Sequence, residues 1–419
     1  MTATQLDTFF GAHVDLGKMQ ADRRTKVAES MRRKGVDAVV LVDPLNVEYV
    51  TGKSQRHGGE RTVALMTADQ TVHTFDAPPD VALPSPLMPE YMLDTWSGIS
   101  HEMADLLGSG ARGHIGIDRA SLVSLRWLRQ ELGHPTRAQV HETGAAVLTA
   151  ARTTKTPEEV ECLRRSNRAM GFALDAVREA LQPGATVADL AETARQAFAQ
   201  LDPVGDVLTM GGAPAAKAAG AGLMYIASSS QNYTAGGEPM FPFPPAPDRP
   251  FQKGDVVWPD SGLGYRGLES DYGRTWICGG VAPTPQQRDQ FKRWIEVRDR
   301  VVDVLRPGHT IGDAVAAARS VGGKTPWLSH LFLAHGTGLF TEYPFFAIDP
   351  EGWLARSLVL PSEMKTLPQL DEVELLPGMV FVLEPVIWDE HGGYRAEDTY
   401  VLTESEPELL SRWTHAPFE

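Results

Sequence analysis

The chain has 419 residues, a hydrophobic fraction of 42%, a charged fraction of 22% and a formal net charge of −15 at pH 7. This composition suits a globular protein of two or three domains, and the acidic charge argues against nucleic acid or an anionic membrane surface as a partner. No run of about eighteen apolar residues predicts a membrane helix, and the first residues lack the basic start and apolar core of a secretory signal.

The cysteine content indicates the redox compartment. The two cysteines, Cys162 and Cys278, lie in a helix-like and a strand-like segment. They provide neither a disulfide framework nor a Cys-x-x-Cys metal motif, which fits the reducing conditions of the cytoplasm. We therefore expect a cytoplasmic protein.

Residues 1–150 predict an α/β domain. The segment 19–34 is amphipathic and ends at Gly35, a residue favoured just past the end of a helix. The other predicted elements are a buried strand over 36–42, a turn over 43–46, a hairpin over 62–67 and 71–75, a strand over 114–118 and a helix over 121–132.

Residues 151–419 predict a second domain, which begins at a strong helix start. In Thr156-Pro157-Glu158-Glu159, threonine is the N-cap, proline takes the first helical position and Glu159 can close a capping box. We place the domain boundary just before this helix.

Two stretches of the second domain are similar to one another. Leu181 begins LQPGATVADLAETAR and Leu305 begins LRPGHTIGDAVAAAR, and each follows a long helix that opens with a Thr-Pro cap. Helix caps can coincide by chance. The same order of two helices and a Pro-Gly turn, found twice, favours a duplicated half.

Five acidic or imidazole side chains beside apolar, strand-like segments form the main candidate site. Glycine-containing turns separate the first two, so a hairpin would bring both carboxylates to one spot; the last two are framed in the same way. Buried carboxylates without partners are costly, and two divalent cations would balance their charge. The alternative is a set of surface carboxylates with a core histidine. The five residues are Asp260 in GDVVWPDSG, Asp271 in SDYGRTW, His335 in LFLAHGTGL, Glu384 in PGMVFVLEP and Glu397 in YRAEDTYVLT.

These segments resemble the prolidase and creatinase patterns GD-VxxDxG, SDxTRT, PGMVFxxEP and RxEDTVLVT, over roughly residues 150–405. The resemblance implies the pita-bread fold: an α/β N-terminal domain, then an α+β catalytic domain with duplicated halves and a curved antiparallel sheet. It also implies a homodimer.

The same resemblance implies a dinuclear metal centre. Asp260 would bind one ion, Asp271 and Glu397 would bridge both, and His335 and Glu384 would hold the other. This oxygen-rich set favours Mn, Fe or Co over Zn. Two close cations lower the pKa of a shared water toward neutrality, which provides a nucleophile or base without a serine or cysteine.

The chain departs from the proline peptidases at two histidines. Their pattern HGxGxxxHExP is replaced here by HGTGLFTEYP, and counting forward from His335 puts Glu342 at the second histidine. A further histidine upstream of Asp260 is also missing, because none occurs between His141 and His309. Such imidazoles contribute about 10²–10⁴-fold each to catalysis, so we expect an activity other than standard Xaa-Pro peptidase work.

A second resemblance is to the dimethylsulfoniopropionate lyases of the same superfamily, which carry DPLN and HGxGxxDE[WY]P; this chain has VLVDPLNVEYVTG and HGTGLFTEYP. The aspartate that acts as base in those lyases falls on Thr341, which is a poor base. Glu342 is the candidate to replace it, and the alternative role of Glu342 is to bind an arginine or a backbone group.

Other side chains are candidates for substrate contacts. Arg395 can hold a substrate carboxylate bidentately or act as a structural partner of Asp260 or Glu384. Trp258, Tyr343, Phe345 and Phe346 form either an aromatic wall for a cationic head group or ordinary core. In creatinase-like dimers the small domain closes over the partner's active site, so Arg56 and His57, in the loop TGKSQRHGGE, are candidates to do so; the alternative is a solvated loop tip.

The sequence therefore predicts a metal-dependent enzyme that cleaves a small polar substrate with a carboxylate or cationic group, by C–N hydrolysis or by β-elimination. The alternatives are an Xaa-Pro dipeptidase or aminopeptidase, a dimethylsulfoniopropionate lyase, and a non-catalytic binding protein that has lost its metals.

Overall fold

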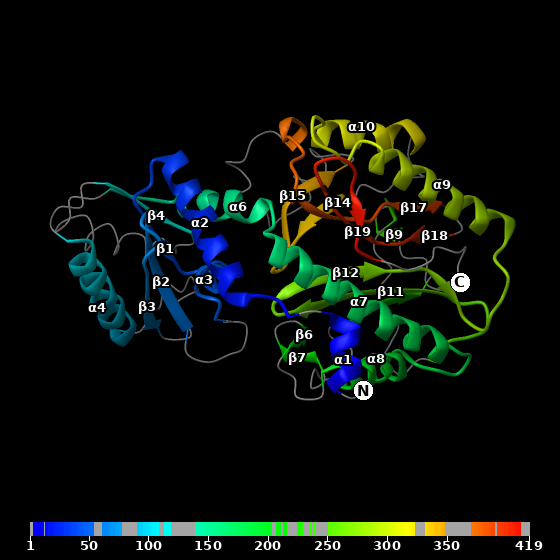
Figure 1. The fold of residues 1–419 in the computed structure, drawn as a ribbon. Helices are drawn as coiled ribbons and strands as arrows, with labels where there is room; N and C mark the ends of the chain where they lie inside the picture. Colours follow the sequence, from blue (N-terminus) through cyan, green and yellow to red (C-terminus); the bar gives the residue numbers. More distant parts are fainter. Residues whose placement is uncertain are drawn as a thin grey trace. The chain divides into compact units, whose positions relative to one another are not determined.

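The computed structural model describes residues 3–11, 13–53, 61–77, 90–108, 113–118, 139–202, 207–210, 213–215, 224–228, 234–235, 238–239, 250–322, 332–347, 370–389 and 392–411. The chain forms two units (Figure 1). One comprises Asp15–Arg152. The other comprises Met1–Val14 and Thr153–Glu419, so the first fourteen residues belong to the unit that the sequence prediction began at residue 151.

The unit Asp15–Arg152 has a five-stranded sheet of order β3-β2-β1-β4-β5. Strand β1 is antiparallel to β2 and parallel to β4, and the predicted hairpin of β2 and β3 is present. The bounds are β1 Ala38–Leu41, β2 Arg61–Thr67, β3 Val72–Ala77, β4 His114–Ile117, β5 Gln139–His141, α2 Leu16–Lys34, α3 Pro44–Thr51, α4 Glu90–Leu107 and α6 Gly144–Thr153.

Two local predictions in this unit have clear outcomes. Helix α2 ends as expected at Gly35, which has φ of 66°. The predicted turn over 43–46 is wrong, because helix α3 begins there: Asp43 accepts a hydrogen bond from the Leu45 amide at 2.9 Å, and Pro44 is in the first helical turn. The helix predicted over 121–132 lies outside the described residues.

The DPLN segment holds this unit together. The Asn46 side chain donates from Nδ2 to Asp118 at 3.0 Å and accepts at Oδ1 from Arg152 at 2.8 Å. The Val42 amide also donates to Asp118, at 2.8 Å. Asn46 therefore links Asp118, at the end of β4, to Arg152 in the last helix of the unit, which is a structural role for this segment.

The second unit repeats one arrangement of two helices followed by antiparallel strands. Thr156 forms the predicted capping box at the start of a long helix, and the predicted Thr-Pro cap at Thr284 is a capping box too. Thr186 and Thr310 each exchange hydrogen bonds with an aspartate at the start of the next helix. The helices are α7 Pro157–Ala180, α8 Val187–Leu201, α9 Pro285–Val302 and α10 Ile311–Gly322, with α1 Ala3–Phe10 from the start of the chain.

Two larger sheets carry most of the described strands of this unit, and β9–β10 and β17–β18 form separate two-stranded pairs. The first has the path β12-β11-β6-β7, with β8 and β13 also paired to β11, and the second has the order β15-β14-β16-β19-β20. The bounds are β6 Leu208–Met210, β7 Ala213–Pro214, β8 Met224–Ser228, β9 Thr234–Ala235, β10 Glu238–Pro239, β11 Val256–Tyr265, β12 Leu268–Gly273, β13 Trp276–Ile277, β14 Phe332–Thr337, β15 Thr341–Ala347, η4 Leu370–Glu372, β16 Val380–Leu383, β17 Val386–Asp389, β18 Gly392–Arg395, β19 Asp398–Val401 and β20 Glu408–Leu409.

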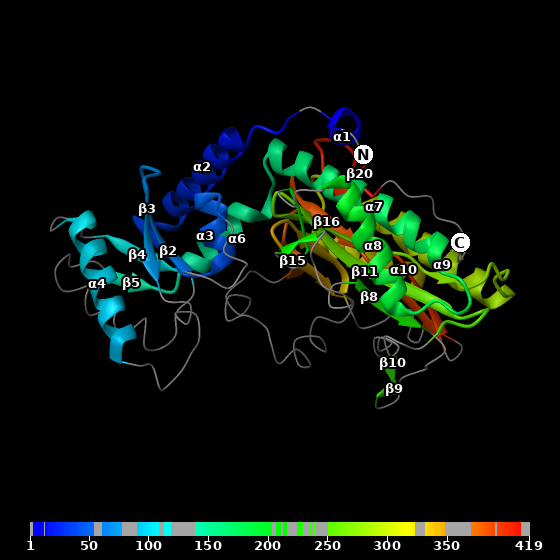
Figure 2. The ribbon, with the colours of Figure 1, turned by 90° about the horizontal axis from the view of Figure 1, so that it is seen from below.

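The helices cover one side of these sheets and leave the other side for the site. Helix α7 lies against strands β11 and β12 (Figure 2), α10 packs against β15, and α9 packs against β17 and β18. Helices α9 and α10 bury the side chains of Trp294, Val297 and Ala318 against Phe346 and Phe381 of the second sheet. In the part of the chain that the structure describes, no helix is both long and apolar enough to cross a membrane.

Candidate metal centre

The first two acidic residues of the candidate site lie on one hairpin. Strand β11 turns into β12 at Arg266 and Gly267, both with positive φ, a two-residue turn suited to the twist of a hairpin. Asp271 pairs with Gly262, and Asp260 lies two residues before Gly262. Residues two apart share a face of a strand and paired residues share a face of a sheet, so both carboxylates project to the same side. This confirms the predicted hairpin.

The other three residues come from the second sheet. His335 is in strand β14, which lies between β15 and β16, Glu384 follows β16, and Glu397 precedes β19, which pairs with β16. The Glu397 amide donates to the Gly273 carbonyl at 3.0 Å, which joins the end of β12 to the second sheet. The site therefore lies where the two sheets meet.

The five side chains come together. Ligand atoms of Asp260, Asp271 and Glu397 all lie within 4.8 Å of one another. His335 Nε2 is 3.3 Å from Asp271 Oδ2 and 3.1 Å from Glu384 Oε1. Its Nδ1 contacts the Gly336 carbonyl at 2.9 Å, which orients the ring so that Nε2 faces the carboxylates.

The charges of this cluster are strongly perturbed. Burial raises the pKa of Asp260 to about 7, and Asp271 and Glu384 add to the rise. Burial and the neighbouring carboxylate of Asp260 raise the pKa of Glu397 well above its usual value. Burial alone would lower the pKa of His335, but hydrogen bonds to Asp271 and Glu384 raise it to about 10. The carboxylates thus hold more negative charge than their surroundings readily accept.

These residues fit a pair of divalent cations. Glu397 is 0% exposed, and neither of its carboxylate oxygens accepts a well-aligned hydrogen bond from the described residues, although Arg395 Nη2 lies 2.6 Å from Oε1. A buried carboxylate without hydrogen bonds is costly, and a cation offsets that cost. A single imidazole with four carboxylates is a hard donor set, as Mn²⁺ prefers.

Metal binding should weaken as the pH falls below about 7. A carboxyl group must lose its proton to bind a cation, and the pKa of Asp260 is about 7, so at about pH 6 roughly nine tenths of these groups carry a proton. The His335 imidazole, whose pKa is raised to about 10, must lose its proton as well, so we expect Mn²⁺ affinity to drop by at least about tenfold from pH 8 to pH 6. Titration calorimetry in two buffers of different ionisation enthalpy should show proton release on binding. An affinity constant over this range would contradict the prediction.

Arg395 lies inside the cluster. Its Nη1 is 3.5 Å from Asp260 Oδ2, its Nη2 pairs with Glu384 and Glu397, and its guanidinium stacks 3.7 Å from the ring centroid of Trp258. Trp258 precedes Asp260 by two residues on β11 and faces the same side. These contacts correspond to the structural alternative for Arg395. Its role as a substrate ligand stays a prediction, and Trp258 supports Arg395.

The Glu342 side chain does not belong to the cluster of candidate metal ligands. It pairs with Gly336, so it projects to the face opposite that of His335. Its Oε2 is 3.0 Å from the Lys155 ammonium, and both side chains are buried. Its Oε1 accepts from the Leu339 amide at 2.8 Å. These contacts favour a structural role over the predicted catalytic one, and Lys155 is a partner that the sequence reasoning missed.

Thr341 is a second candidate for the place of the missing histidine. It pairs with Thr337, which shares the face of His335, and it is exposed. Counting back from Pro344 in the pattern HGxGxxxHExP matches Glu342 to the glutamate and Thr341 to the histidine, so this chain is one residue shorter in the turn. Counting forward from His335 gives Glu342 instead, because the pattern has one more residue in the turn than this chain has.

The remaining predicted contacts divide between the site and the core. Phe345 pairs with His335, with ring centroids 6.4 Å apart, and Tyr343 is half-buried. Phe346 is fully buried against Phe381 and belongs to the core. Arg56 and His57 lie outside the described residues, so their roles stay predictions.

A second residue that the sequence reasoning missed is Arg274. Its Nη1 donates to the Glu397 carbonyl at 2.5 Å, and its Nη2 donates to Asp398 at 3.0 Å. It is 3% exposed and stacks on Tyr272. This arginine fixes the segment that carries Glu397, and its place in SDYGRTW, three residues after the candidate ligand Asp271, was the available clue.

This combination of fold and cluster defines a metallopeptidase-type protein. The model of the metallopeptidase family M24 matches residues 161–404, and that of the creatinase/prolidase N-terminal domain matches residues 23–145. The chain belongs to the metallopeptidase family M24, and its two-part pita-bread fold is the predicted one.

Individual relatives are distant. The chain is 24% identical to an Xaa-Pro dipeptidase of Pyrococcus furiosus, over 93% of this chain and 98% of that protein. It is 23% identical to the dimethylsulfoniopropionate lyase DddP of Roseobacter denitrificans, over 96% and 88%. Among solved structures, the prolidase of Pyrococcus horikoshii superposes with a TM-score of 0.65 at 20% identity, covering 94% of this chain and 99% of that one.

Proposed function

We propose that the protein is a dinuclear-metal hydrolase of a small polar substrate, outside standard Xaa-Pro peptidase activity. The observation that supports the proposal is the clustering of the five candidate metal ligands beside strand β15, where Thr341 matches the second histidine when the peptidase pattern is counted back from Pro344. The cluster would bind the metal ions that activate water. Because residue 341 is a threonine, the face where a substrate would lie lacks the imidazole of the peptidase pattern. Two divalent ions, Mn, Fe or Co rather than Zn, suit the donor set.

Arg395, Tyr343 and Thr341 would each have a separate role in the proposed reaction. When bound, the two cations supply Lewis acidity and a water nucleophile at neutral pH. Arg395, already paired to Glu384 and Glu397, fixes these ligands and presents positive charge to a substrate carboxylate. Burial raises the pKa of Tyr343 to about 12, so its phenol stays protonated and can donate a hydrogen bond. The Thr341 hydroxyl can orient a polar group but is a poor proton donor.

β-Elimination is the second candidate, because the lyase DddP matches the chain over nearly its whole length. That reaction needs a base next to the metals. Glu342, bound to Lys155 on the opposite face, is poorly placed for it. Hydrolysis is therefore the reaction that we favour.

The test compares substrates on protein whose metal content has been measured. Mn-, Fe- or Co-loaded enzyme is offered Xaa-Pro dipeptides, betaines, sulfonium acids, and guanidino acids, with Asp271→Ala as the inactive control. Turnover of a non-peptide substrate that Asp271→Ala abolishes supports the proposal. Efficient Xaa-Pro hydrolysis would show instead that the chain is a dipeptidase. Release of an alkene product would show a lyase.

Restoring an imidazole should create peptidase activity. Thr341→His places histidine on the exposed inner face, so we expect Xaa-Pro hydrolysis to rise by about 10²-fold or more. Thr341→Asn is the matched control, because it keeps a polar side chain without a titratable group. Equal rates for the two variants would contradict the assignment of Thr341 to the histidine position. Assays of both variants at equal metal content give the comparison.

A further inference from the structure

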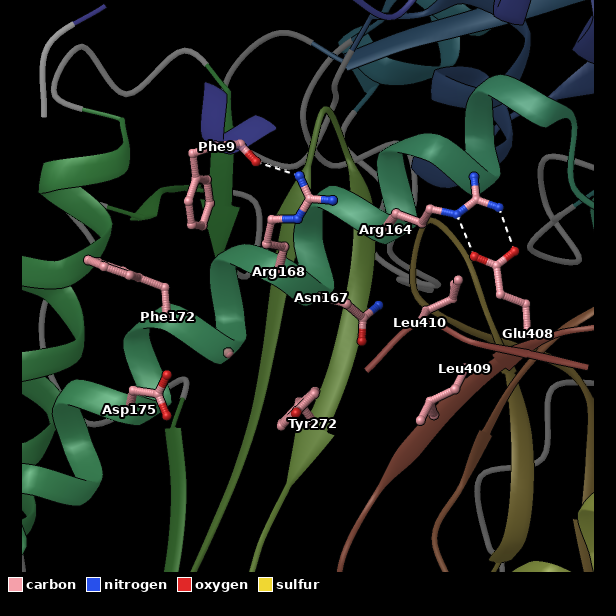
Figure 3. A pocket seen from close by; sticks show the side chains of 11 residues that line it. Phe9, Arg164, Asn167, Arg168, Phe172, Asp175, Tyr272, Glu408, Leu409 and Leu410 are labelled. Carbon is pink, nitrogen blue, oxygen red and sulfur yellow. Dashed lines mark hydrogen bonds and ion pairs between the residues drawn. The ribbon is translucent and has the colours of Figure 1, made fainter. Parts of the chain in front are cut away.

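The arginines of a pocket beside helix α7 are paired within the chain (Figure 3). Arg164 donates to both oxygens of Glu408, at 2.9 and 2.7 Å, and Arg168 donates to the Phe9 carbonyl. Their guanidinium groups are therefore engaged by the fold, and a stronger indication of a ligand lies in the unit Asp15–Arg152.

Two histidines lie together on one face of the sheet in that unit. Strand β4 carries His114, and the parallel strand β5, at the end of the sheet order, carries His141. His114 pairs with Gln139, and His141 lies two residues further along β5, so all three side chains share one face. The alternate residues Ile115 and Val140 are buried in the core, so the histidines project from the opposite face.

The two imidazole rings approach one another where solvent can reach them. His114 is exposed and His141 is half-buried. Their ring centroids are 5.2 Å apart, with the ring planes inclined at 56°. Gly116 is the residue opposite His141 and adds no side chain to this face. The rings therefore converge on an open part of the sheet.

This separation matches that of two imidazoles on one tetrahedral ion. A Zn–N bond is about 2.0–2.1 Å long and a ring centroid lies about 1.1 Å beyond its nitrogen, so each centroid would be about 3.2 Å from the ion. At the tetrahedral angle of about 109°, two such centroids are about 5.2 Å apart. Two neighbouring ligands of a square-planar ion, at about 90°, would bring the centroids to about 4.5 Å. The observed 5.2 Å fits the tetrahedral arrangement.

A hydrogen bond leaves one nitrogen of His141 available as a metal ligand. Its Nε2 lies 3.3 Å from Gln139 Oε1. An amide oxygen can only accept, so Nε2 donates and the neutral ring keeps its lone pair on Nδ1. Metal-binding histidines almost always donate their other ring nitrogen in this way, which fixes the tautomer and the orientation of the ring. Gln139 is therefore suited to orient His141 as a ligand.

We propose that His114 and His141 bind a Zn²⁺ ion, with water completing the tetrahedral coordination. Imidazole suits Zn²⁺, whereas carboxylate oxygens suit Mn²⁺, so this pair and the carboxylate-rich cluster select different ions. The ion links β5 to β4 and stabilises the unit. The proposal is independent of the proposed function, because none of the five predicted catalytic metal ligands belongs to Asp15–Arg152.

The test is a calorimetric titration of Zn²⁺ into full-length protein that carries Asp271→Ala, which weakens the competing carboxylate cluster. His114→Asn and His141→Asn, each added to this background, should weaken one zinc-binding event by at least about tenfold, because each removes half of the chelate. Gln139→Leu should weaken the same event by about tenfold, the loss expected for an outer partner of a ligand. His73→Asn is the matched control, since His73 is a half-buried histidine of β3 whose paired residue is Leu65.

Three outcomes would overturn the proposal. One is zinc binding that is equally tight in the His73, His114 and His141 variants. Another is a loss in only one of the His114 and His141 variants, since the two rings would then not share an ion. The third is no zinc-binding event beyond those that both variants retain, up to about 1 mM Zn²⁺. Thermal denaturation of each variant without zinc separates loss of the ligands from loss of the fold.

Discussion

Glu397→Gln should raise, or leave unchanged, the thermal stability of the metal-free protein. It should also abolish the increase in stability that metal binding gives. The pKa of Glu397 is raised well above normal by burial and by Asp260, so the metal-free fold already disfavours its charge. Glutamine removes that charge at nearly the same volume. With metal, however, the variant lacks a predicted bridging ligand, and activity should fall by at least about a hundredfold, the loss that disturbing even outer partners of a metal causes.

The measurement is the midpoint of thermal unfolding with and without Mn²⁺. A ligand present at about 100 times its Kd stabilises the folded state by about 2.7 kcal/mol, and the variant should lose this gain. Glu372→Gln is the matched control: it makes the same charge change at an exposed position in η4. If Glu397→Gln destabilised the metal-free protein by several kcal/mol, or kept the metal response, the proposed ligand role would be wrong.

Lys155→Met should be the most destabilising substitution away from the metal site. It leaves the Glu342 carboxylate buried without its cation, and breaking a buried ion pair in this way costs about 3–5 kcal/mol. Urea unfolding, followed by tryptophan fluorescence, gives the change in the free energy of unfolding.

The double variant Lys155→Met, Glu342→Gln tests the cause. Glutamine removes the orphaned charge and can still accept from the Leu339 amide, so much of the stability should return. A loss below about 1 kcal/mol for Lys155→Met alone, the range of exposed ion pairs, would show that Glu342 is not held as described. Activity of the double variant also bears on Glu342: near-normal turnover excludes it as the catalytic base.

The hairpin that carries Asp260 and Asp271 and the helix starts could be predicted because the information is local. Thr156-Pro157 carries its capping partners within one turn, and the glycine after Arg266 permits the tight turn that brings Asp271 beside Asp260. The same local reasoning predicted a turn at Asp43 where the structure has a helix cap, since aspartate before proline suits both.

The face of a residue in strand β15 could not be predicted by counting. Glu342 and Thr341 are neighbours, and a shift of one residue moves a side chain to the other face of a sheet. The pairing with β14 skips residues near His335, so the register depends on tertiary structure. Lys155 likewise comes from a distant segment of the chain, and no residue near Glu342 in the sequence predicts their ion pair.

The division of the five predicted ligands between the two larger sheets has a consequence for the history of the molecule. Asp260 and Asp271 come from the first half, and His335, Glu384 and Glu397 come from the second. If the halves arose by copying one ancestral segment, neither half alone now carries all five predicted ligands. Selection for catalysis could then act only on the two halves together. Each half could lose a ligand residue that the other half kept.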